Sequence, residues 1–306
     1  MLRLCIILVF FCCGFQAVAQ KAADTSIFKY PILMDSVVVV AKRDGWDVGA
    51  FIKRVQNDTT FYKAFRALHL VSYTATNDME VYDKEDKIKA SLHSHTRQQV
   101  QNHCRTMQVL DEKTTGDFYK HNKEYRYYTA ELFAYLFFTK GKICNENDIV
   151  AGQLDARGKG QMEKNKAELK QLIFNPGGHI NGIPFIGDKA SIFDPDEAIH
   201  YNFSLLSEEY DGQDCYVFKA IPKKGEEKDL VYNELSTWFR KSDYSIVARD
   251  YSLSFSTLFY DFDVHMQVRT HQVDTRLLPT SVLYNGNWHI LTQKRETVKF
   301  LATFSY

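Results

Sequence analysis

Proline is scarce in this sequence, with 6 among 306 residues, and no low-complexity linker interrupts the chain. A chain of this length can bury a large core, as one big domain or two small ones. Without a proline-rich or repetitive boundary, one continuous α+β domain is favoured over two. We therefore expect a single domain over residues 20–306, with an extended N-terminal half.

The sequence also lacks an excess of either charge. It contains 38 basic and 38 acidic residues, so the formal net charge is zero. A neutral chain creates no field that draws in nucleic acid or an acidic membrane surface. We expect no nucleic-acid partner.

Recognisable catalytic motifs are absent as well. The chain has no Gly-x-Ser-x-Gly elbow, no glycine-rich phosphate loop, no His-Glu-x-x-His and no Cys-x-x-Cys. His93 and His95 would share one face of a strand and could meet a metal, but two solvated histidines on a polar face are favoured. Asp261 and Asp263 belong to the wet side of a strand. His179 and the acidic stretch 194–197 could form a loop site, but the chemistry of flexible turns explains these residues equally well. We expect no catalytic residues, no metal site and no cofactor.

The first residues have the features of an export signal. Arg3 supplies a positive charge, residues 4–15 are apolar, and Ala17-Val18-Ala19 fits a small-x-small cleavage pattern. The apolar run is too short to span a bilayer. A lipoprotein signal, with Cys12 or Cys13 carrying the lipid, is the less favoured alternative, because the preceding residues are not small. Residues 1–19 are thus predicted to be a signal peptide, and the protein is predicted to be periplasmic or associated with the outer membrane.

Cysteine is sparse for an exported protein. Only Cys104, Cys144 and Cys215 lie beyond the signal. Cys215 falls in an apolar strand and is expected to be a buried free thiol. Cys104 and Cys144 are candidates for a disulfide, but the sequence does not settle their geometry.

Aromatic residues are abundant at 14%, and the last seventy residues, from about 235 to 306, contain successive alternating segments. Such alternation gives each strand one apolar and one wet face. The Asn285-Gly286 pair is typical of a tight hairpin turn. These segments predict an antiparallel meander. Its apolar face is predicted to hold Tyr251, Leu253, Phe255, Tyr260, Phe262, Val264 and Met266.

The N-terminal half mixes helices and strands. Asp47 and Asp58 are expected to cap two short helices, the second with Phe61, Phe65 and Leu68 on one stripe. A buried strand is predicted at 37–40, further strands between 70 and 110, and a helix over 158–176. The aromatic segment 125–138 is interpreted as a buried core helix, with a mobile lid as the alternative.

The C-terminal half contains several motifs in a recurring order: Trp238-Phe239-Arg240, Ile246-Val247 with Arg249, Leu278-Pro279-Thr280, and the segment 284–288. In these motifs it resembles periplasmic lipoprotein carriers and receptors of the LolA/LolB kind. The resemblance covers roughly residues 200–306, and the inserted region 82–155 departs from the pattern. The resemblance implies a strongly curved antiparallel sheet, a half-open barrel, with helices covering the concave face. It also implies a non-catalytic protein that binds a hydrophobic small molecule, a lipid or a lipidated protein, with peripheral contact to the outer membrane.

Two tryptophans are added to the predicted apolar lining. Trp238 and Trp288 each lie near the end of a strand, where an indole can stay half-wet with its N–H satisfied. Two other functions stay open at this stage: an envelope hydrolase with an unrecognised site, and a sensor that binds a membrane-protein partner through an edge strand.

Overall fold

The computed structural model describes residues 48–149, 175–178, 189–257, 260–290 and 294–306. The chain divides into a unit of Met1–Ser36 and a unit of Val37–Tyr306, and every described residue belongs to the second. The predicted export signal, the predicted strand at 37–40 and most of the predicted helix at 158–176 lie outside the described residues.

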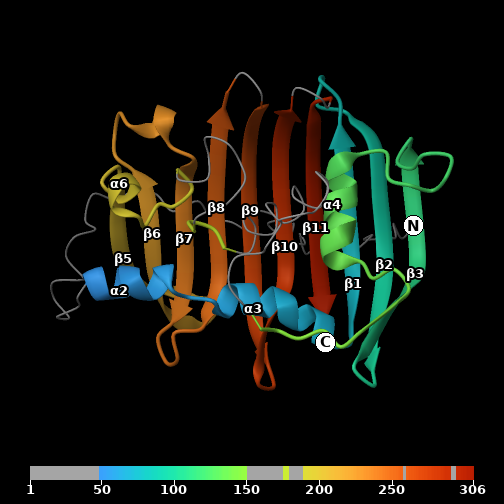
Figure 1. Cartoon of the computed structure of the whole chain (residues 1–306), viewed down its shortest axis with the longest axis horizontal. Helices are drawn as coiled ribbons and strands as arrows, with labels where there is room; N and C mark the ends of the chain where they lie inside the picture. The colour runs from blue at the N-terminus through green and yellow to red at the C-terminus, as the bar shows by residue number, and fades with distance from the viewer. Residues whose placement is uncertain (1–47, 150–174, 179–188, 258–259, 291–293) are drawn as a thin grey trace, which may run out of the picture. The chain divides into compact units, whose positions relative to one another are not determined.

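One antiparallel sheet of eleven strands dominates this unit (Figure 1). The strands are β1 Tyr73–Tyr82, β2 Ile88–Gln101, β3 Cys104–Gly116, β4 Lys142–Cys144, β5 Tyr201–Tyr210, β6 Gln213–Pro222, β7 Tyr232–Arg240, β8 Ile246–Ser256, β9 Tyr260–Val273, β10 Arg276–Ile290 and β11 Glu296–Ser305. Their order across the sheet is β4-β3-β2-β1-β11-β10-β9-β8-β7-β6-β5. The first and last strands in this order are different, so the sheet is open.

The C-terminal meander predicted from alternation is confirmed. Strands β5 to β11 follow one another in space as they do in sequence. The clearest alternation belongs to β11, in which Val298, Phe300, Ala302 and Phe304 are buried and the residues between them are less so. Short links suffice for this arrangement because antiparallel neighbours need only a hairpin turn.

The N-terminal strands complete the sheet by pairing with its C-terminal strand. β1 lies antiparallel to β11, with Met79 opposite Phe300 and Ala75 opposite Phe304. β2 and β3 continue outward as a hairpin whose turn residues, Asn102 and His103, both have positive φ. Asparagine tolerates this left-handed conformation. This turn lies within the segment 70–110, for which the sequence predicts further strands.

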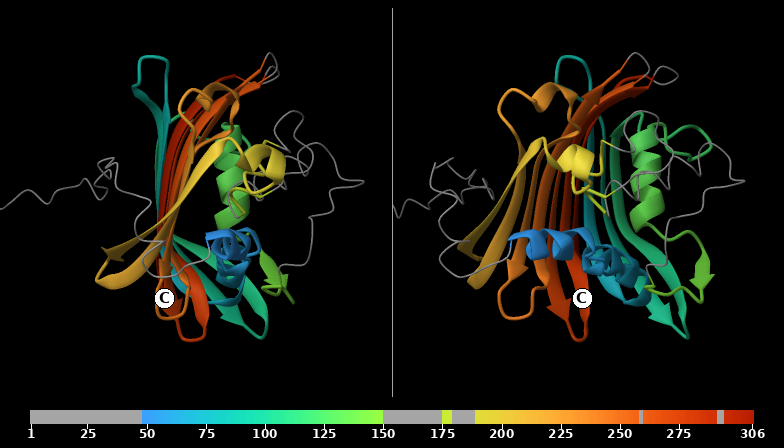
Figure 2. Two further views of the ribbon diagram at one scale, coloured as in Figure 1. Left: turned by 90° about the vertical axis from the view of Figure 1, so that its left-hand side faces the viewer. Right: turned by 60° about the vertical axis from the view of Figure 1, so that its left-hand side comes forward.

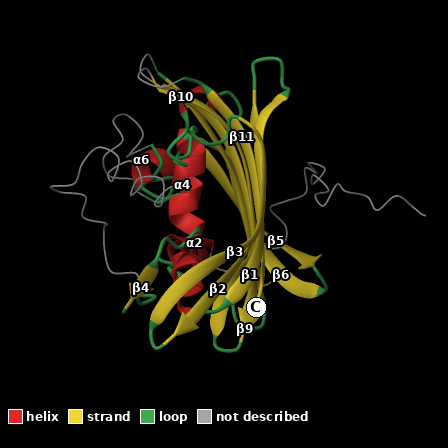
Figure 3. Cartoon of the chain, turned by 90° about the vertical axis from the view of Figure 1, so that its right-hand side faces the viewer, coloured by secondary structure: helices red, strands yellow, loops and turns green. Residues whose placement is uncertain are grey.

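The described α-helices and the first 3-10 helix lie on the same side of the sheet (Figures 2 and 3). They are α2 Val48–Gln56, α3 Thr60–Ala67, the 3-10 helix η1 Leu68–Leu70, α4 Tyr128–Phe137 and the short α6 Pro195–Ala198, while a second 3-10 helix, η2 Glu227–Asp229, lies in the link between β6 and β7. The sheet bends around them, so the helices occupy its concave face. This arrangement confirms the predicted fold class, an α+β fold with a strongly curved antiparallel sheet and helices over the concave face. We call the side chains on this side of the sheet the concave layer.

The apolar stripes of α2 and α3 rest on the concave layer as predicted. Phe51 of α2 lies with its ring centroid 5.4 Å from that of Phe239 on β7. In α3, Phe61 and Phe65 are buried, and Leu68 is buried in η1. Asp58 accepts hydrogen bonds at Oδ1 from the backbone N–H groups of Thr60 and Phe61, at 3.1 and 3.4 Å. These bonds satisfy amides that a helix start leaves unpaired.

The predicted hairpin turn at Asn285-Gly286 is wrong. β10 runs through both residues, with Gly286 opposite Val264 on β9 and Val298 on β11. A Cβ atom on Gly286 would lie 2.0 Å from the hydroxyl of Tyr284, so the glycine makes room for the Tyr284 ring, which lies over it. Glycine serves here for close approach of a side chain and not for positive φ.

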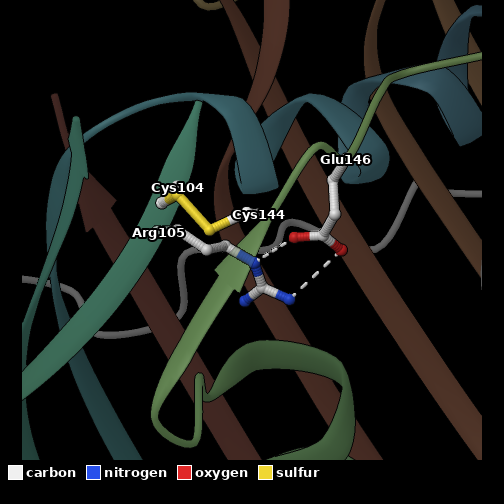
Figure 4. The surroundings of a disulfide bond; sticks show 4 residues. All are labelled: Cys104, Arg105, Cys144 and Glu146. Atoms are coloured by element: carbon white, nitrogen blue, oxygen red, sulfur yellow. Dashed lines mark hydrogen bonds and ion pairs between the residues drawn. A yellow bond between two sulfur atoms is a disulfide. The ribbon is translucent and has the colours of Figure 1, made fainter. Parts of the chain in front are cut away.

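A disulfide joins Cys104 and Cys144, directly opposite each other on β3 and β4 (Figure 4). The bridge closes a loop with a sequence separation of 40 residues, and α4 lies within that loop. It therefore ties a covering helix to the sheet. Cys215 is a buried free thiol, as predicted.

Glu146 lies beside this disulfide and links three parts of the chain. Its carboxylate accepts a hydrogen bond from Arg105 Nε at 2.5 Å and lies 2.9 Å from Nδ1 of His69 (Figure 4 shows the arginine). Arg105 also donates to the hydroxyl of Thr139, which follows α4. Burial raises the pKa of Glu146, but the hydrogen bonds and charges of His69 and Arg105 outweigh it and hold the pKa at about 2.

This carboxylate predicts acid sensitivity. A folded-state pKa below the unfolded value stabilises the fold above pH 4.5, and the contribution is lost as the pH falls toward 2. Because 27% of the side chain is exposed, we expect Glu146 to contribute about 1–2 kcal/mol to the free energy of unfolding. Urea unfolding should show that Glu146→Gln lowers the unfolding free energy at pH 6 and that the difference shrinks near pH 2. The exposed Glu85→Gln serves as the control and should match wild type throughout. A Glu146→Gln deficit that does not change with pH would contradict this assignment.

Candidate functional site

The predicted apolar lining forms one continuous part of the concave layer. On β8 and β9, Tyr251 lies opposite Met266, Leu253 opposite Val264, and Phe255 opposite Phe262. Directly opposed residues project to the same face. Phe262 is also opposite Trp288 on β10, which brings that tryptophan to the same side. Tyr260 is two residues before Phe262, and its side chain lies outside the described part of the structure.

These residues differ in burial along the strands. Tyr251, Leu253, Val264 and Met266 are buried, whereas Phe255 and Phe262 are partly buried and pack against the same core. The exposure of the lining therefore increases toward the end of β8 and the start of β9. That the lining contacts a ligand stays a prediction.

Trp238 does not belong to this lining. It lies opposite Val217 on β6 and Ala248 on β8, and it packs in a separate cluster with Cys215 and Val247. Its neighbour Thr237 is the residue on the concave side, beside Arg249. The sequence misplaced Trp238 because residues 235–239 of β7 are buried on both faces, so the strand shows no alternation that fixes its orientation. The indole N–H is satisfied by Glu208 Oε1 at 2.5 Å.

Trp288 helps to hold the start of α4. Its Nε1–H donates to the Thr129 hydroxyl at 2.7 Å, and its ring centroid lies 5.2 Å from that of Tyr128. Glu296 on β11 accepts hydrogen bonds from the backbone N–H groups of Tyr128 and Thr129, each at 2.9 Å. A carboxylate there satisfies unpaired amides and complements the helix dipole. The sequence offered no local sign of this cap, because 167 residues separate Glu296 from Thr129.

The rest of α4 is held by aromatic packing. The Phe133 ring lies 4.5 Å from that of Phe300 and 4.8 Å from that of Tyr284, centroid to centroid. Phe137 stacks against Phe300 at 5.7 Å. The helix is thus a packed part of the core in this structure, as the sequence interpretation of 125–138 favoured. Polar contacts anchor both ends of α4 to the sheet, because the hydroxyl of Tyr73 on β1 donates to the carbonyl oxygen of Phe137 at 3.4 Å.

Several polar side chains are buried in the concave layer, and the sequence analysis assigned them no role. On the β1–β2 side they are Asn77, Ser94, Thr96 and Gln98. On the β7–β8 side, burial lowers the pKa of Arg249, and the charge of Asp58 opposes that effect. Burial raises the pKa of Tyr232 to about 12, so this hydroxyl stays protonated at neutral pH. Arg249 has the same parity as Tyr251 and Leu253, which is the sequence signal that places it on this face.

The histidine pair considered as a metal site lies on the opposite, outer face. His93 and His95 are both exposed, and Nδ1 of His93 lies 2.6 Å from Oδ1 of Asp78. Asp261 is paired with Arg295 at 2.7 Å. Within the described residues, no group of three or more His, Cys, Asp or Glu side chains is placed to hold a metal ion. Among the described helices, none has the length and apolar character needed to cross a membrane.

No protein-family model matches this chain, and no curated protein matches it. Solved structures that match include a DUF1329 family protein from Desulfovibrio piger, at 13% identity over 86% of this chain and 90% of that one, with a TM-score of 0.23. A putative outer membrane lipoprotein-sorting protein domain from Vibrio parahaemolyticus matches at 13% identity over 85% and 89%, with a TM-score of 0.26. A LolA superfamily protein from Nitrosomonas europaea matches at 10% identity over 81% and 92%, with a TM-score of 0.23.

The fold of this chain is defined by its own strand order, registers and helix placement. The site that this fold defines is a helix-covered apolar face on a curved open sheet.

Proposed function

We propose that this protein is a non-catalytic binding protein of the cell envelope. It shelters a hydrophobic group, a lipid or the acyl chain of a lipidated partner, between the concave layer and the covering helices. The proposal includes residues 1–19 as an export signal and residues 20–306 as one domain. It places the protein in the periplasm or at the periplasmic side of the outer membrane.

The observation that carries the proposal is how the concave layer is covered. Among the residues that the structure describes, a wide apolar face is covered by separate short helices and not by a second sheet. These helices contact the sheet through side chains, so a helix can move aside while every strand keeps its ladder hydrogen bonds. Burying a methylene contributes about 0.8 kcal/mol, and an acyl chain of about ten methylenes therefore offsets the loss of some helix contacts.

Tryptophan fluorescence can test this proposal because the two described tryptophans lie on opposite faces. One variant keeps Trp288 alone (Trp46→Phe, Trp238→Phe), and the matched control keeps Trp238 alone (Trp46→Phe, Trp288→Phe). Titration with dodecanoic acid or dodecanol should change the emission of Trp288, which lies beside α4, and leave that of Trp238 unchanged. If neither compound alters the emission of Trp288, the proposal fails.

A second measurement separates a binding protein from a hydrolase. The protein is purified without detergent, extracted with organic solvent, and the extract is analysed by mass spectrometry. A co-purifying lipid in stoichiometric amount supports the proposal. A lipid-free protein that turns over ester substrates supports an envelope hydrolase instead.

A further inference from the structure

The concave layer contains a buried positive charge at Arg249 on β8. The side chain is 4% exposed and lies on the face that carries Tyr251 and Leu253. A guanidinium keeps its proton under all ordinary conditions, and taking a charge out of water is strongly unfavourable unless an opposite charge compensates it. An arginine here therefore requires an explanation.

The partners of Arg249 within the described chain compensate it only in part. Its Nε donates to the hydroxyl of Thr237 at 3.0 Å, and its guanidinium carbon lies 4.4 Å from the ring centroid of Phe61 on α3. None of the ion pairs among the described residues includes Arg249, and its two terminal nitrogens make no hydrogen bond there. With respect to the described residues, both terminal NH₂ groups therefore remain available as donors.

Asp58 is the acidic group that acts on this guanidinium through its charge, but it is engaged elsewhere. Its carboxylate accepts hydrogen bonds from Thr60 and Phe61 at the start of α3 and is not within ion-pair distance of Arg249. The negative charge that would pair with the arginine is thus missing from the described residues.

A second buried donor lies within electrostatic reach of the arginine. The Tyr232 hydroxyl accepts a hydrogen bond from the backbone N–H of Gly177 at 3.0 Å, and its own proton has no acceptor among the described residues. Tyr232 lies opposite Leu253, which shares a face of β8 with Arg249, so both side chains belong to the concave layer. Burial raises the pKa of Tyr232 more than the positive charge of Arg249 lowers it, so the hydroxyl keeps its proton.

We propose that Arg249 and Tyr232 bind the carboxylate head of a single-chain fatty acid whose hydrocarbon tail lies along the concave layer. A guanidinium presents a fork of N–H donors that matches a carboxylate, and a tyrosine hydroxyl adds a further donor. One buried cation is neutralised by one carboxylate, whereas a phosphate monoester carries more negative charge than the site balances. The inference rests on the proposed function and adds the chemical class of the ligand.

The test compares dodecanoate with dodecanol in the variant that keeps Trp288 alone. We expect dodecanoate to bind about 10- to 100-fold more tightly than dodecanol, because a hydrogen bond between charged groups contributes a free energy of this size. Arg249→Met should remove this preference because it weakens the binding of dodecanoate and leaves the binding of dodecanol unchanged. Arg97→Met is the matched control, because Arg97 is exposed on the outer face of β2, and it should keep the preference. Dodecyl phosphate should bind more weakly than dodecanoate.

The melting temperature of the ligand-free protein distinguishes a binding role from a structural one. Replacing an uncompensated buried charge by an apolar side chain of similar length should leave the melting temperature unchanged or raise it. If Arg249→Met instead lowers the melting temperature and weakens both ligands equally, the arginine is structural and the inference is wrong.

The outcomes separate this inference from the proposed function. Equal binding of dodecanoate and dodecanol by the wild-type background overturns the head-group site and leaves the proposed function standing. Binding of neither compound overturns both. If Arg249→Met does not fold, Tyr232→Phe takes its place. This variant removes one hydrogen bond, so a selective loss of about 3- to 10-fold in the affinity for dodecanoate supports the site. An unchanged preference for dodecanoate overturns the site.

Discussion

Phe300→Ala is expected to lower the unfolding free energy by about 3–5 kcal/mol, the range for removing a buried phenylalanine ring. Phe300 is 1% exposed and lies between the sheet and α4. Its ring contacts both Phe133 and Phe137 of that helix, so truncation leaves a cavity at the centre of the interface. Equilibrium unfolding in urea measures the change directly.

The neighbouring residue provides the control for this effect. Leu301 is 36% exposed and projects to the outer face, so Leu301→Ala should change stability by less than about 1 kcal/mol. Comparable losses for the two variants would mean that the orientation of β11 is not the one described. A loss confined to Phe300 supports the orientation of the whole strand, because residues two apart share a face.

Removing the disulfide is the second change with a large expected effect. The double variant Cys104→Ala/Cys144→Ala should lose about 4 kcal/mol, because the bridge restricts an unfolded loop with a sequence separation of 40 residues. Part of this loss should appear as looser packing of α4, which lies within the loop. Hydrogen exchange of the α4 amides should therefore be faster in the double variant than in wild type.

Reducing agent provides the control for the disulfide. Under reducing conditions the wild-type protein and the double variant should unfold at similar denaturant concentrations, since both then lack the bridge. A full difference that persists after complete reduction would assign the loss to side-chain packing and not to the covalent link.

The sequence predicted the parts of the fold that depend on local pattern. Alternation in β8, β9 and β11 identified strands and the face that each one buries, since side chains alternate strictly along a strand. The apolar stripe of Phe61, Phe65 and Leu68 likewise identified a helical segment with one buried side. Both patterns are periodic along the chain, so they can be recognised without knowing which residues pack against them in the fold.

Errors arose where burial or packing removed the local signal. Trp238 was assigned to the wrong face because its strand is apolar on both sides. Asn285-Gly286 was interpreted as a turn because that pair suits positive φ, whereas the glycine accommodates the ring of Tyr284. In each case the deciding contact comes from the three-dimensional packing around the residue.

The sequence by itself determined that this protein has an α+β fold with an antiparallel meander, and its resemblance to LolA/LolB-like proteins implied the curved sheet and the helices over its apolar face. Only the tertiary structure placed β1 beside β11, joined Cys104 to Cys144, and set Glu296 at the start of α4. It alone also showed that Arg249 is buried and has no ion-pair partner among the described residues. The physical reason is the sequence distance over which each feature acts. The periodicity of apolar residues indicates which side of a single strand or helix is buried. Strand pairing, helix capping and charge compensation instead join residues that are distant in the chain and become neighbours only after folding.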